Sequence, residues 1–454
     1  MHFGWALCRV SARGGVPDTE SVVMIRTDRS DRATRVVPTF DAPLIVHSHL
    51  RWDFVWQRPQ QLLSRFAESV PVLFVEEPLF ADDLSHARLD LSTPAPNVTR
   101  AVPVLPATLR DHGDRALAEV RTLLLAALAR GGALGGRFTA PVQWFYTPMP
   151  APTMIGAFGE RGIVYDCMDE LSKFRFAPRE LVDRERMLMA RADVVFTGGH
   201  KLWLSKSKRH PNVHFFGCGV DSAHFAKARR SDLPRPTDLA DVDAPILGYY
   251  GVIDERIDYD LVRGLAEAHP DCVVAMVGPV VKVDPRELPQ APNIRWLGQK
   301  PYAELPMYAK AFDVCLMPFA LNEATEYINP TKTLEYMAAG KPIVSTPIAD
   351  VLHHFTPVVS VADTVQDFAA AVRVALTAPD PELIARGIGM AKEHTWDSIV
   401  ARMCAIIVDA LDATDLVDAH LAPFAAGATK PAAAPARRAV PPLLEAVGGE
   451  GMTA

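Results

Sequence analysis

The sequence predicts an α/β fold made of two domains with a cleft between them. In both halves of the chain, short apolar stretches typical of buried strands alternate with helical stretches, as in α/β domains. A polar stretch rich in Pro and Asp, residues 233–244, separates the halves and is typical of a linker. The length of 454 residues also favours two or three domains. Two such domains joined by a linker imply a cleft, which is a usual place for a ligand.

The composition excludes several classes of protein. The net charge of −7 argues against nucleic-acid binding, which usually needs a basic surface. The six cysteines are scattered and form no CxxC pair, as expected in a reducing compartment without a structural zinc. No apolar run reaches the ~18 residues that span a bilayer, and the N-terminal region lacks the apolar core of a secretory signal. We therefore expect a cytoplasmic protein and leave open a peripheral contact with the inner face of the membrane.

The first half begins with a polar, arginine-rich stretch, residues 1–39, which we expect to be a flexible extension; Met24 could also start the chain. Residues 79–110 are rich in Pro and are predicted to be irregular. Strands are expected at 43–46, 70–75, 142–146, 162–170, 193–197 and 213–216, and helices at 57–66, 114–130, 178–192 and 200–208.

The second half repeats this alternation. Its last amphipathic helix is expected at 396–411, and the Ala/Pro/Gly-rich chain beyond residue 422 is expected to be disordered. The other predicted strands are 246–251, 272–277, 294–297, 314–318 and 358–361, and the other helices are 259–269, 302–311, 365–376 and 381–394.

One stretch, residues 329–346, has both ends of a short helix marked and continues into a strand. Asn329 is suited to cap the helix, and Pro330 to occupy its first position, where no donor is lost. Gly340 can take the left-handed conformation that ends a helix, and Pro342 blocks its continuation. The N-terminus of this helix would therefore present free N–H groups and a partial positive charge.

Lys332 and Glu335 are predicted to lie near the start of this helix. Lys332 adds a full positive charge at an end that already suits a phosphate. Glu335, about one turn or ~5 Å further along, could accept two hydrogen bonds from a ribose diol. The alternative is a capped helix on which these two side chains form only a surface ion pair.

Charged and aromatic side chains also gather after the strand at 43–46, at the strand end where open α/β sheets bind ligands. Arg51 or Arg58 could hold a phosphate or carboxylate, and His47 or His49 could act as a base near neutral pH. The alternative is a solvated loop with an aromatic anchor. The candidate binding residues are His49, Arg51, Asp53 and Arg58, beside Trp52, Phe54 and Trp56, which we expect to be exposed.

Two aspartates, Asp166 and Asp169, stand at the end of the predicted strand 162–170. A carboxylate that faces a cleft can deprotonate a sugar hydroxyl as a general base. The alternative is a cap for the next helix.

The first predicted strand of the second half leads into Gly251 and Arg256. Gly251 would permit close approach of a phosphate, and Arg256 would offset its charge. Glu323 and Glu326, in the loop before residues 329–346, could contact a bound sugar or simply be solvated. The histidine pair at 353–354 has no acidic or cysteine partner at ligand spacing, so we predict no metal site.

Residues 329–346 read Asn-Pro-Thr-Lys-Thr-Leu-Glu-Tyr-Met-Ala-Ala-Gly-Lys-Pro-Ile-Val-Ser-Thr. This stretch closely resembles the nucleotide-sugar motif of bacterial group 1 (family 4-like) glycosyltransferases of GT-B fold. Similar stretches of that family are found at 49–60, 165–172, 251–256 and 394–397, and the resemblance extends over about residues 43–412. Together they resemble a subgroup that builds cell-surface polysaccharide.

The resemblance implies two Rossmann-like domains facing a cleft, and metal-independent transfer from a nucleotide-diphosphate sugar without a cofactor. By position, Glu335 would hold the ribose, Arg256 would stabilise the leaving phosphates, and Thr331, Lys332 and Thr333 would face the diphosphate. The predicted domains are an extension at 1–39, an acceptor domain at 40–232, a nucleotide-sugar domain at 233–395, a helix crossing back at 396–412 and a disordered tail at 422–454.

The sequence departs from the family pattern in three places. Tyr327 stands where the family usually has a second glutamate, so Glu326 or Glu323 would take its place. The family's Arg–Lys pair is reduced to Arg256, and residues 147–148 replace a histidine often seen there. These departures leave retention or inversion at the anomeric carbon open, and they favour the two first-half aspartates as candidate bases, which inversion would need.

We therefore expect a glycosyltransferase of hexosyltransferase type that moves a sugar from a nucleotide-diphosphate donor to a saccharide or lipid-linked acceptor in polysaccharide or envelope glycan synthesis. The alternatives are a nucleotide-sugar epimerase on the same fold and a non-catalytic sugar-binding protein. The expected partners are the donor and the acceptor, with no nucleic acid.

Overall fold

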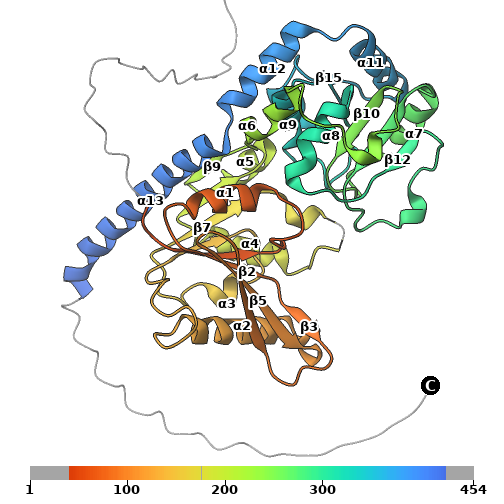
Figure 1. Cartoon of the computed structure of the whole chain (residues 1–454). Coiled ribbons are helices and arrows are strands. Elements are labelled where there is room, and N and C mark those ends of the chain that lie inside the picture. Colours follow the sequence, from red (N-terminus) through yellow and green to blue (C-terminus); the bar gives the residue numbers. More distant parts are fainter. Residues whose placement is uncertain (1–39, 175, 426–454) are drawn as a thin grey trace, which may run out of the picture. The chain divides into compact units, whose positions relative to one another are not determined.

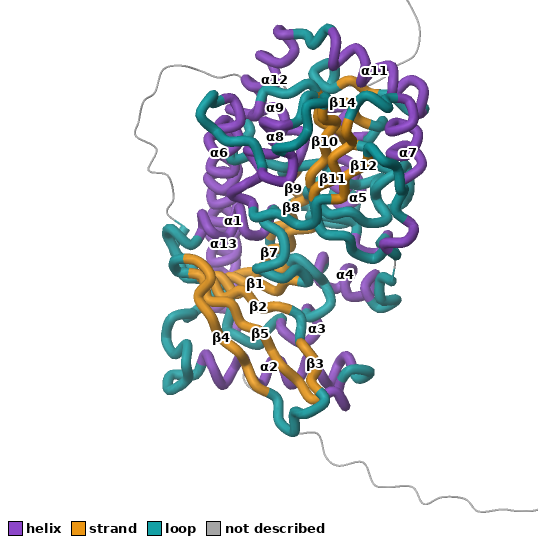
Figure 2. The backbone as a smooth tube through the Cα atoms, turned by 45° about the vertical axis from the view of Figure 1, so that its right-hand side comes forward, coloured by secondary structure: helices purple, strands orange, loops and turns teal. Residues whose placement is uncertain are grey.

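The computed structural model describes residues 40–174 and 176–425, with side chains up to residue 413. The described residues belong to one compact unit. The predicted extension at 1–39 and the predicted tail beyond residue 425 lie outside the described residues. The chain is organised around two largely parallel sheets, which Figures 1 and 2 show with helices beside them.

The first sheet contains nine strands among the described residues: β1 (Leu44–Ser48), β2 (Val72–Glu76), β3 (Leu79–Ala81), β4 (Arg88–Ala95), β5 (Val98–Pro106), β6 (Val142–Phe145), β7 (Gly162–Cys167), β8 (Val194–Thr197) and β9 (Val213–Phe215). Their order is β3-β5-β2-β1-β6-β7-β8-β9, and β4 pairs with β5 as the antiparallel member. All five residues of the central β1 are buried. A nearly continuous apolar run of this kind is typical of a parallel strand covered on both faces.

The second sheet contains β10 (Ile246–Tyr250), β11 (Val273–Val277), β12 (Ile294–Trp296), β13 (Val314–Met317), β14 (Ile343–Ser345) and β15 (Ser360–Val361). Its order is β12-β11-β10-β13-β14-β15, and every pair is parallel. This is the Rossmann order, in which ligands bind beyond the carboxyl ends of the strands where the chain changes direction across the sheet. That point lies between β10 and β13.

Helices connect the strands in both halves. They are α1 (Arg58–Phe66), α2 (Gly113–Leu128), α3 (Ala151–Met154), α4 (Leu181–Met189), α5 (His200–Lys206), α6 (Ser222–Ala226), α7 (Tyr259–Ala268), α8 (Leu305–Ala311), α9 (Lys332–Ala339), α10 (Ala349–His354), α11 (Val365–Thr377), α12 (Pro381–Glu393) and α13 (Trp396–Ala425). Short 3₁₀ turns lie at Ala107–Leu109, Leu171–Lys173, Lys227–Arg229, Thr237–Leu239, Pro285–Glu287 and Tyr302–Glu304.

The last helix, α13, follows the second sheet in the chain but packs against α1 and the first sheet (Figure 1). Its buried side chains Trp396, Met403 and Ile407 share one apolar core with Leu44 and Val46 of β1. The helix runs to Ala425, beyond its predicted end at residue 411. Among the described helices, none has the length and apolar character needed to cross a bilayer. The predicted division of the chain at residue 232 stays a prediction.

The prediction that residues 79–110 are irregular is wrong, because they form β3, β4 and β5. Three of the prolines that suggested a loop, Pro94, Pro103 and Pro106, lie within strands, and Pro96 lies in the turn between β4 and β5. Pro103 lies between the residues of β5 that pair with β2 and those that pair with β3, so it falls where the parallel neighbour changes. The short helices α3, α6 and α10 were not predicted, since four to six residues give too little periodicity.

Candidate active site

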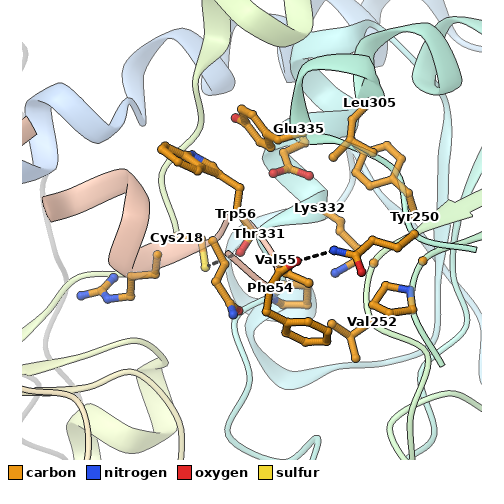
Figure 3. Close-up of a pocket in the computed structure, with 18 of the residues that line it drawn as sticks. Phe54, Val55, Trp56, Cys218, Tyr250, Val252, Leu305, Thr331, Lys332 and Glu335 are labelled. Carbon is orange, nitrogen blue, oxygen red and sulfur yellow. Dashed lines mark hydrogen bonds between the residues drawn. The ribbon is translucent and has the colours of Figure 1, made fainter. Parts of the chain in front are cut away.

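A cavity of about 490 Å³ is lined by loops at the carboxyl ends of strands from both sheets (Figure 3). From the first sheet come residues 52–58, which follow β1, and Asp169, which follows β7. From the second sheet come Gly251 and Arg256, which follow β10, and the start of α9. This size is within the usual range for small-molecule sites.

Helix α9 starts later than the sequence indicated. Its first residue is Lys332, and Thr331 is the capping residue, with φ −52° and ψ −35°. The predictions that Asn329 caps the helix and that Pro330 is its first residue are therefore wrong. The end of the helix is as predicted: Gly340 is left-handed, with φ 73° and ψ 40°.

The side chain of Asn329 is used elsewhere, which explains why it does not cap α9. Its Oδ1 accepts a hydrogen bond from the backbone N–H of Cys218 at 2.9 Å. Its Nδ2 donates to Asp350 at 2.7 Å, and Asp350 also accepts from the backbone N–H of His200 at 3.1 Å. Because Cys218 and His200 follow strands of the first sheet, Asn329 fixes the segment before α9 to the first half of the chain.

Lys332 and Glu335 both line the cavity, as predicted for a nucleotide-binding pair. Neither has an ion-pair partner within the described part of the chain, so the alternative of a surface ion pair is wrong. The Lys332 ammonium lies over the Tyr249 ring, 5.5 Å from its centroid, and burial lowers its pKa. Glu335 is 8% exposed, and burial raises its pKa to about 7, although Lys332 opposes this rise.

Gly251 allows Lys332 to approach the end of β10. Its φ is +146°, and a Cβ at this position would lie 2.0 Å from Cε of Lys332. Only glycine therefore fits both the backbone conformation and the space. Arg256 also lines the cavity, where Asp254 orients it: Nε donates to Oδ1 at 2.9 Å and Nη2 to Oδ2 at 2.8 Å.

The two threonines on either side of Lys332 point in different directions. Thr331 lines the cavity and donates from Oγ1 to the Cys218 sulfur at 3.1 Å. Thr333 is fully buried and donates to the sulfur of Met317 in β13, so the prediction that it faces a diphosphate is wrong. Cys218, which also lines the cavity, was not identified from the sequence, because no motif surrounds it.

Arg58 and Asp166 form a buried ion pair. Nε of Arg58 donates to both carboxylate oxygens at 3.0 and 3.2 Å, Nη2 donates at 2.9 Å, and Nη1 donates to the Phe216 carbonyl. Asp166 is 0% exposed. Asp166 is buried and does not line the cavity, which speaks against a role as the base, whereas Arg58 lines the cavity and its role in acceptor binding stays a prediction.

Asp169 is the predicted carboxylate that the structure places at the cavity. Burial raises its pKa, while the nearby Arg256 and Arg58 lower it. No ion pair within 4.0 Å is formed by Asp169 among the described residues. Its carboxylate is therefore available to a ligand, and a raised pKa suits a general base.

The other predicted first-half residues are placed differently. Arg51 does not line the cavity; it donates to Glu76 at 3.0 Å and to the Glu77 carbonyl at 2.6 Å. His49 also lies off the cavity lining, and burial, with Lys282 nearby, lowers its pKa to about 4. The cavity lining thus gives no support to Arg51 and His49 as acceptor-binding residues, and that role stays a prediction.

The remaining side chains in and before this loop are Asp53, Trp52 and His47. Asp53 lines the cavity, with a side chain 63% exposed and paired with Arg100. Trp52, expected to be exposed, is only 4% exposed and packs edge-on against Phe74. His47 lies in β1, is 2% exposed, shares a hydrogen bond with Gln143 and does not line the cavity, and burial lowers its pKa to about 4.

Glu323 and Glu326 do not line the cavity, contrary to prediction. Glu323 pairs with Lys173, and Glu326 pairs with Lys201, both at 3.4 Å. These lysines belong to the first half of the chain. The two glutamates thus contribute to contacts between the halves, and their contact with a bound sugar stays a prediction.

Aromatic residues of the cavity wall were missed as site residues. Tyr250, at the end of β10, and Tyr302 line it, and the Tyr302 ring stacks on His224 with centroids 4.5 Å apart. Gln61 donates to the Tyr302 hydroxyl at 2.9 Å. In the sequence these residues look like ordinary strand, helix and core positions, and nothing marks them as facing a cleft.

Comparison with known proteins agrees with this geometry. Residues 251–378 match the family model of group 1 glycosyl transferases. A Bacillus subtilis (strain 168) protein named a teichuronic acid biosynthesis glycosyltransferase, TuaH, is 26% identical over 220 residues, which cover 44% of this chain and 54% of that protein. The matched region thus spans about half the length of that curated relative.

Solved structures share the fold over most of the chain. An E. coli structure described as trehalose-6-phosphate, bound with UDP-2-fluoro glucose, superposes with a TM-score of 0.60 and 14% identity, covering 82% of this chain and 99% of that one. Sucrose-phosphate synthase from Thermosynechococcus elongatus superposes with a TM-score of 0.59 and 15% identity, covering 82% of this chain and 100% of that one. Residues 251–378 thus resemble a group 1 glycosyltransferase domain, and the chain has the GT-B fold of these solved structures.

Proposed function

We propose that the protein transfers a sugar from a nucleotide-diphosphate sugar to a saccharide acceptor, free or lipid-linked, in the synthesis of a cell-surface polysaccharide. The observation that carries this proposal is the pair Lys332 and Glu335, one helical turn apart, both in the cavity and both without an ion-pair partner among the described residues. The relative named for teichuronic acid biosynthesis supports the polysaccharide context.

In this proposal the donor lies along the start of α9. The diphosphate would face Lys332, Thr331 and the Arg256 guanidinium, where the helix N-terminus adds partial positive charge. The ribose diol would donate two hydrogen bonds to Glu335. Lys332 and Arg256 would also stabilise the charge that develops on the leaving diphosphate.

Asp169 is the proposed general base. It lines the same cavity from the first sheet, so an acceptor hydroxyl held between Asp169 and the donor would lose its proton to this carboxylate. A base of this kind fits direct displacement, in which the acceptor oxygen forms the new glycosidic bond as the bond to the nucleoside diphosphate breaks. The neighbouring Asp166 would position the loop through its ion pair with Arg58.

The transfer is proposed to occur in the cytoplasm, with contact at the inner face of the membrane, and to need no metal. The free cysteines of the described chain support a reducing compartment: Cys167, Cys218, Cys272, Cys315 and Cys404. Full activity in excess EDTA would support the metal-independent reaction, and loss of activity that Mg²⁺ restores would contradict it.

The proposal is tested by calorimetry with UDP, GDP, ADP and dTDP, followed by assays with the matching nucleotide sugars. We expect one nucleoside diphosphate to bind, and its release from the nucleotide sugar to accelerate when acceptor is added. Interconversion of sugars without acceptor would instead identify an epimerase. Tight binding without turnover would identify a binding protein.

A further inference from the structure

The cavity contains four cationic side chains, and three are neutralised by carboxylates of the protein. Arg58 is paired with Asp166 and Arg256 with Asp254. The third, Lys300, is 2.7 Å from Asp238. Only the fourth, Lys332 at the start of α9, has no carboxylate within 4.0 Å in the described part of the chain. The uncompensated positive charge of the cavity is thus concentrated at the proposed diphosphate position.

One wall of the cavity is apolar and aromatic. It contains Phe54, Val55 and Trp56 from the loop after β1, which Figure 3 labels, and all three are partly exposed. Pro94 of β4 also lines the cavity. This wall also carries a charged side chain, Asp53, whose carboxylate forms an ion pair with Arg100. A ligand on this side would meet rings and a carboxylate, and no uncompensated cation of the described residues.

Trp56 is held in place by rings and hydrogen bonds around it. Its centroid lies 6.1 Å from that of Trp52, which is buried, and 6.0 Å from that of Tyr302. The neighbouring Phe54 carbonyl accepts a hydrogen bond from Gln299 of the second half. A fixed, partly exposed indole offers a flat apolar face at low cost in side-chain entropy.

We propose that this wall, here called the aromatic wall and made of Phe54, Val55 and Trp56, binds an uncharged saccharide unit as the acceptor, and that the site rejects phosphorylated and acidic sugars. The apolar face of a neutral sugar ring would lie on Trp56 or Phe54, while its hydroxyls face Asp53 and Asp169. An anionic sugar would place its charge near the Asp169 carboxylate, which no cation of the described residues pairs within 4.0 Å, and it would find no unpaired cation on this wall to compensate its lost hydration. The inference rests on the proposed transferase function and adds the class of acceptor.

The test uses the full chain with the nucleoside diphosphate that binds most tightly in the calorimetric panel, present at saturation. Binding of chitobiose, lactose and maltose is measured by saturation-transfer NMR and titration, against glucose 6-phosphate and galacturonate. We expect at least one neutral sugar to bind at least tenfold more tightly than either anion. Raising the salt concentration should leave that neutral affinity unchanged.

Variants then locate the binding. Trp56→Ala should weaken the neutral sugar at least tenfold, while Trp56→Phe, which keeps a ring, should recover most of that loss. Phe176→Ala is the matched control, because Phe176 is 83% exposed and does not line the cavity. All three variants should bind the nucleoside diphosphate as the wild type does, which separates this test from the proposed donor site.

The inference is overturned if glucose 6-phosphate or galacturonate binds more tightly than every neutral sugar, or if no neutral sugar binds at all. It is also overturned if Trp56→Ala leaves neutral-sugar binding unchanged. If no nucleoside diphosphate binds the wild type, the transferase proposal itself fails, and that result is distinct from each of these.

Discussion

Replacing Glu335 by glutamine should have opposite effects on stability and on nucleotide affinity. The carboxylate is 8% exposed, and burial raises its pKa from 4.5 to about 7. An acid with a raised folded-state pKa contributes stability below pH 4.5, and that contribution is lost as the pH rises through 7. The difference between the pKa values of 4.5 and about 7 corresponds to about 3 kcal/mol of destabilisation at pH 8 in the free protein. Glu335→Gln removes the charge and should stabilise the free protein by up to about that amount, with the gain fading toward pH 4.5.

The same change should weaken the nucleotide. A carboxylate accepts a hydrogen bond from each hydroxyl of a ribose diol, whereas an amide offers one oxygen and presents an N–H₂ to the second hydroxyl. A hydrogen bond to a charged group contributes roughly 1.5–3 kcal/mol, so we expect about 10- to 100-fold weaker binding. Because the ionised form is the one that binds, the ratio of wild-type to variant affinity should rise from pH 5.5 to 7 and then level off near the pKa of about 7.

Denaturant unfolding of the free protein and calorimetry with the bound nucleoside diphosphate measure the two effects across this pH range. Taking the ratio of affinities cancels the titration of the ligand's own phosphate. Glu323→Gln is the matched control, because Glu323 lies off the cavity with a 73% exposed side chain, and it should change neither quantity. Equal nucleotide affinity in the wild type and Glu335→Gln would refute the ribose assignment. Lower stability of the variant at pH 8 would refute the reasoning from burial.

Three further substitutions test other parts of the site. Asp169→Asn should not weaken nucleotide binding, and it should reduce transfer by about 10²–10⁴-fold, as loss of a general base does. Wild-type rates of product formation, followed by chromatography, would contradict this. Asp166→Asn should lower the free energy of unfolding by about 3–5 kcal/mol, because it leaves the Arg58 charge buried and unpaired; a urea midpoint equal to that of the wild type would speak against it. Gly251→Ala should displace Lys332, because the new Cβ would lie 2.0 Å from Cε of Lys332. We expect nucleotide binding to weaken about tenfold, which corresponds to ~1.4 kcal/mol. An unchanged affinity by calorimetry would exclude the proposed role of Gly251 in making room for Lys332.

The sequence alone supported the parts of the fold and site that depend on local pattern. Alternating strands and helices predicted the α/β class, and Gly340 correctly marked the end of α9. The placement of Lys332 and Glu335 in the cavity followed from their spacing and from the resemblance of the motif. The start of the helix was misplaced, because Asn329 and Pro330 have good capping chemistry that the tertiary structure does not use.

The errors concern contacts between distant residues. Arg58 and Asp166 are 108 positions apart, so no local pattern indicates that each neutralises the other. Thr333 follows Lys332 directly, and successive helical side chains diverge by about 100°, so Thr333 faces Met317 of β13 rather than the cavity. Sequence reasoning finds polar residues near strand ends, but it does not tell which of them already have a partner.

Donor binding should itself activate the base. In the free protein, Arg256 lowers the pKa of Asp169 against the rise caused by burial. A bound diphosphate would pair with Arg256 and weaken that effect, so the pKa of Asp169, which burial already raises, should rise further when donor is present. A carboxylate with a higher pKa is a better proton acceptor for a sugar hydroxyl. NMR of Asp169 labelled with ¹³C at its carboxylate should therefore show a higher pKa with the nucleoside diphosphate than without it. An unchanged or lower pKa on binding would mean that the diphosphate does not reach Arg256, and the donor would then have to lie against Lys332 alone.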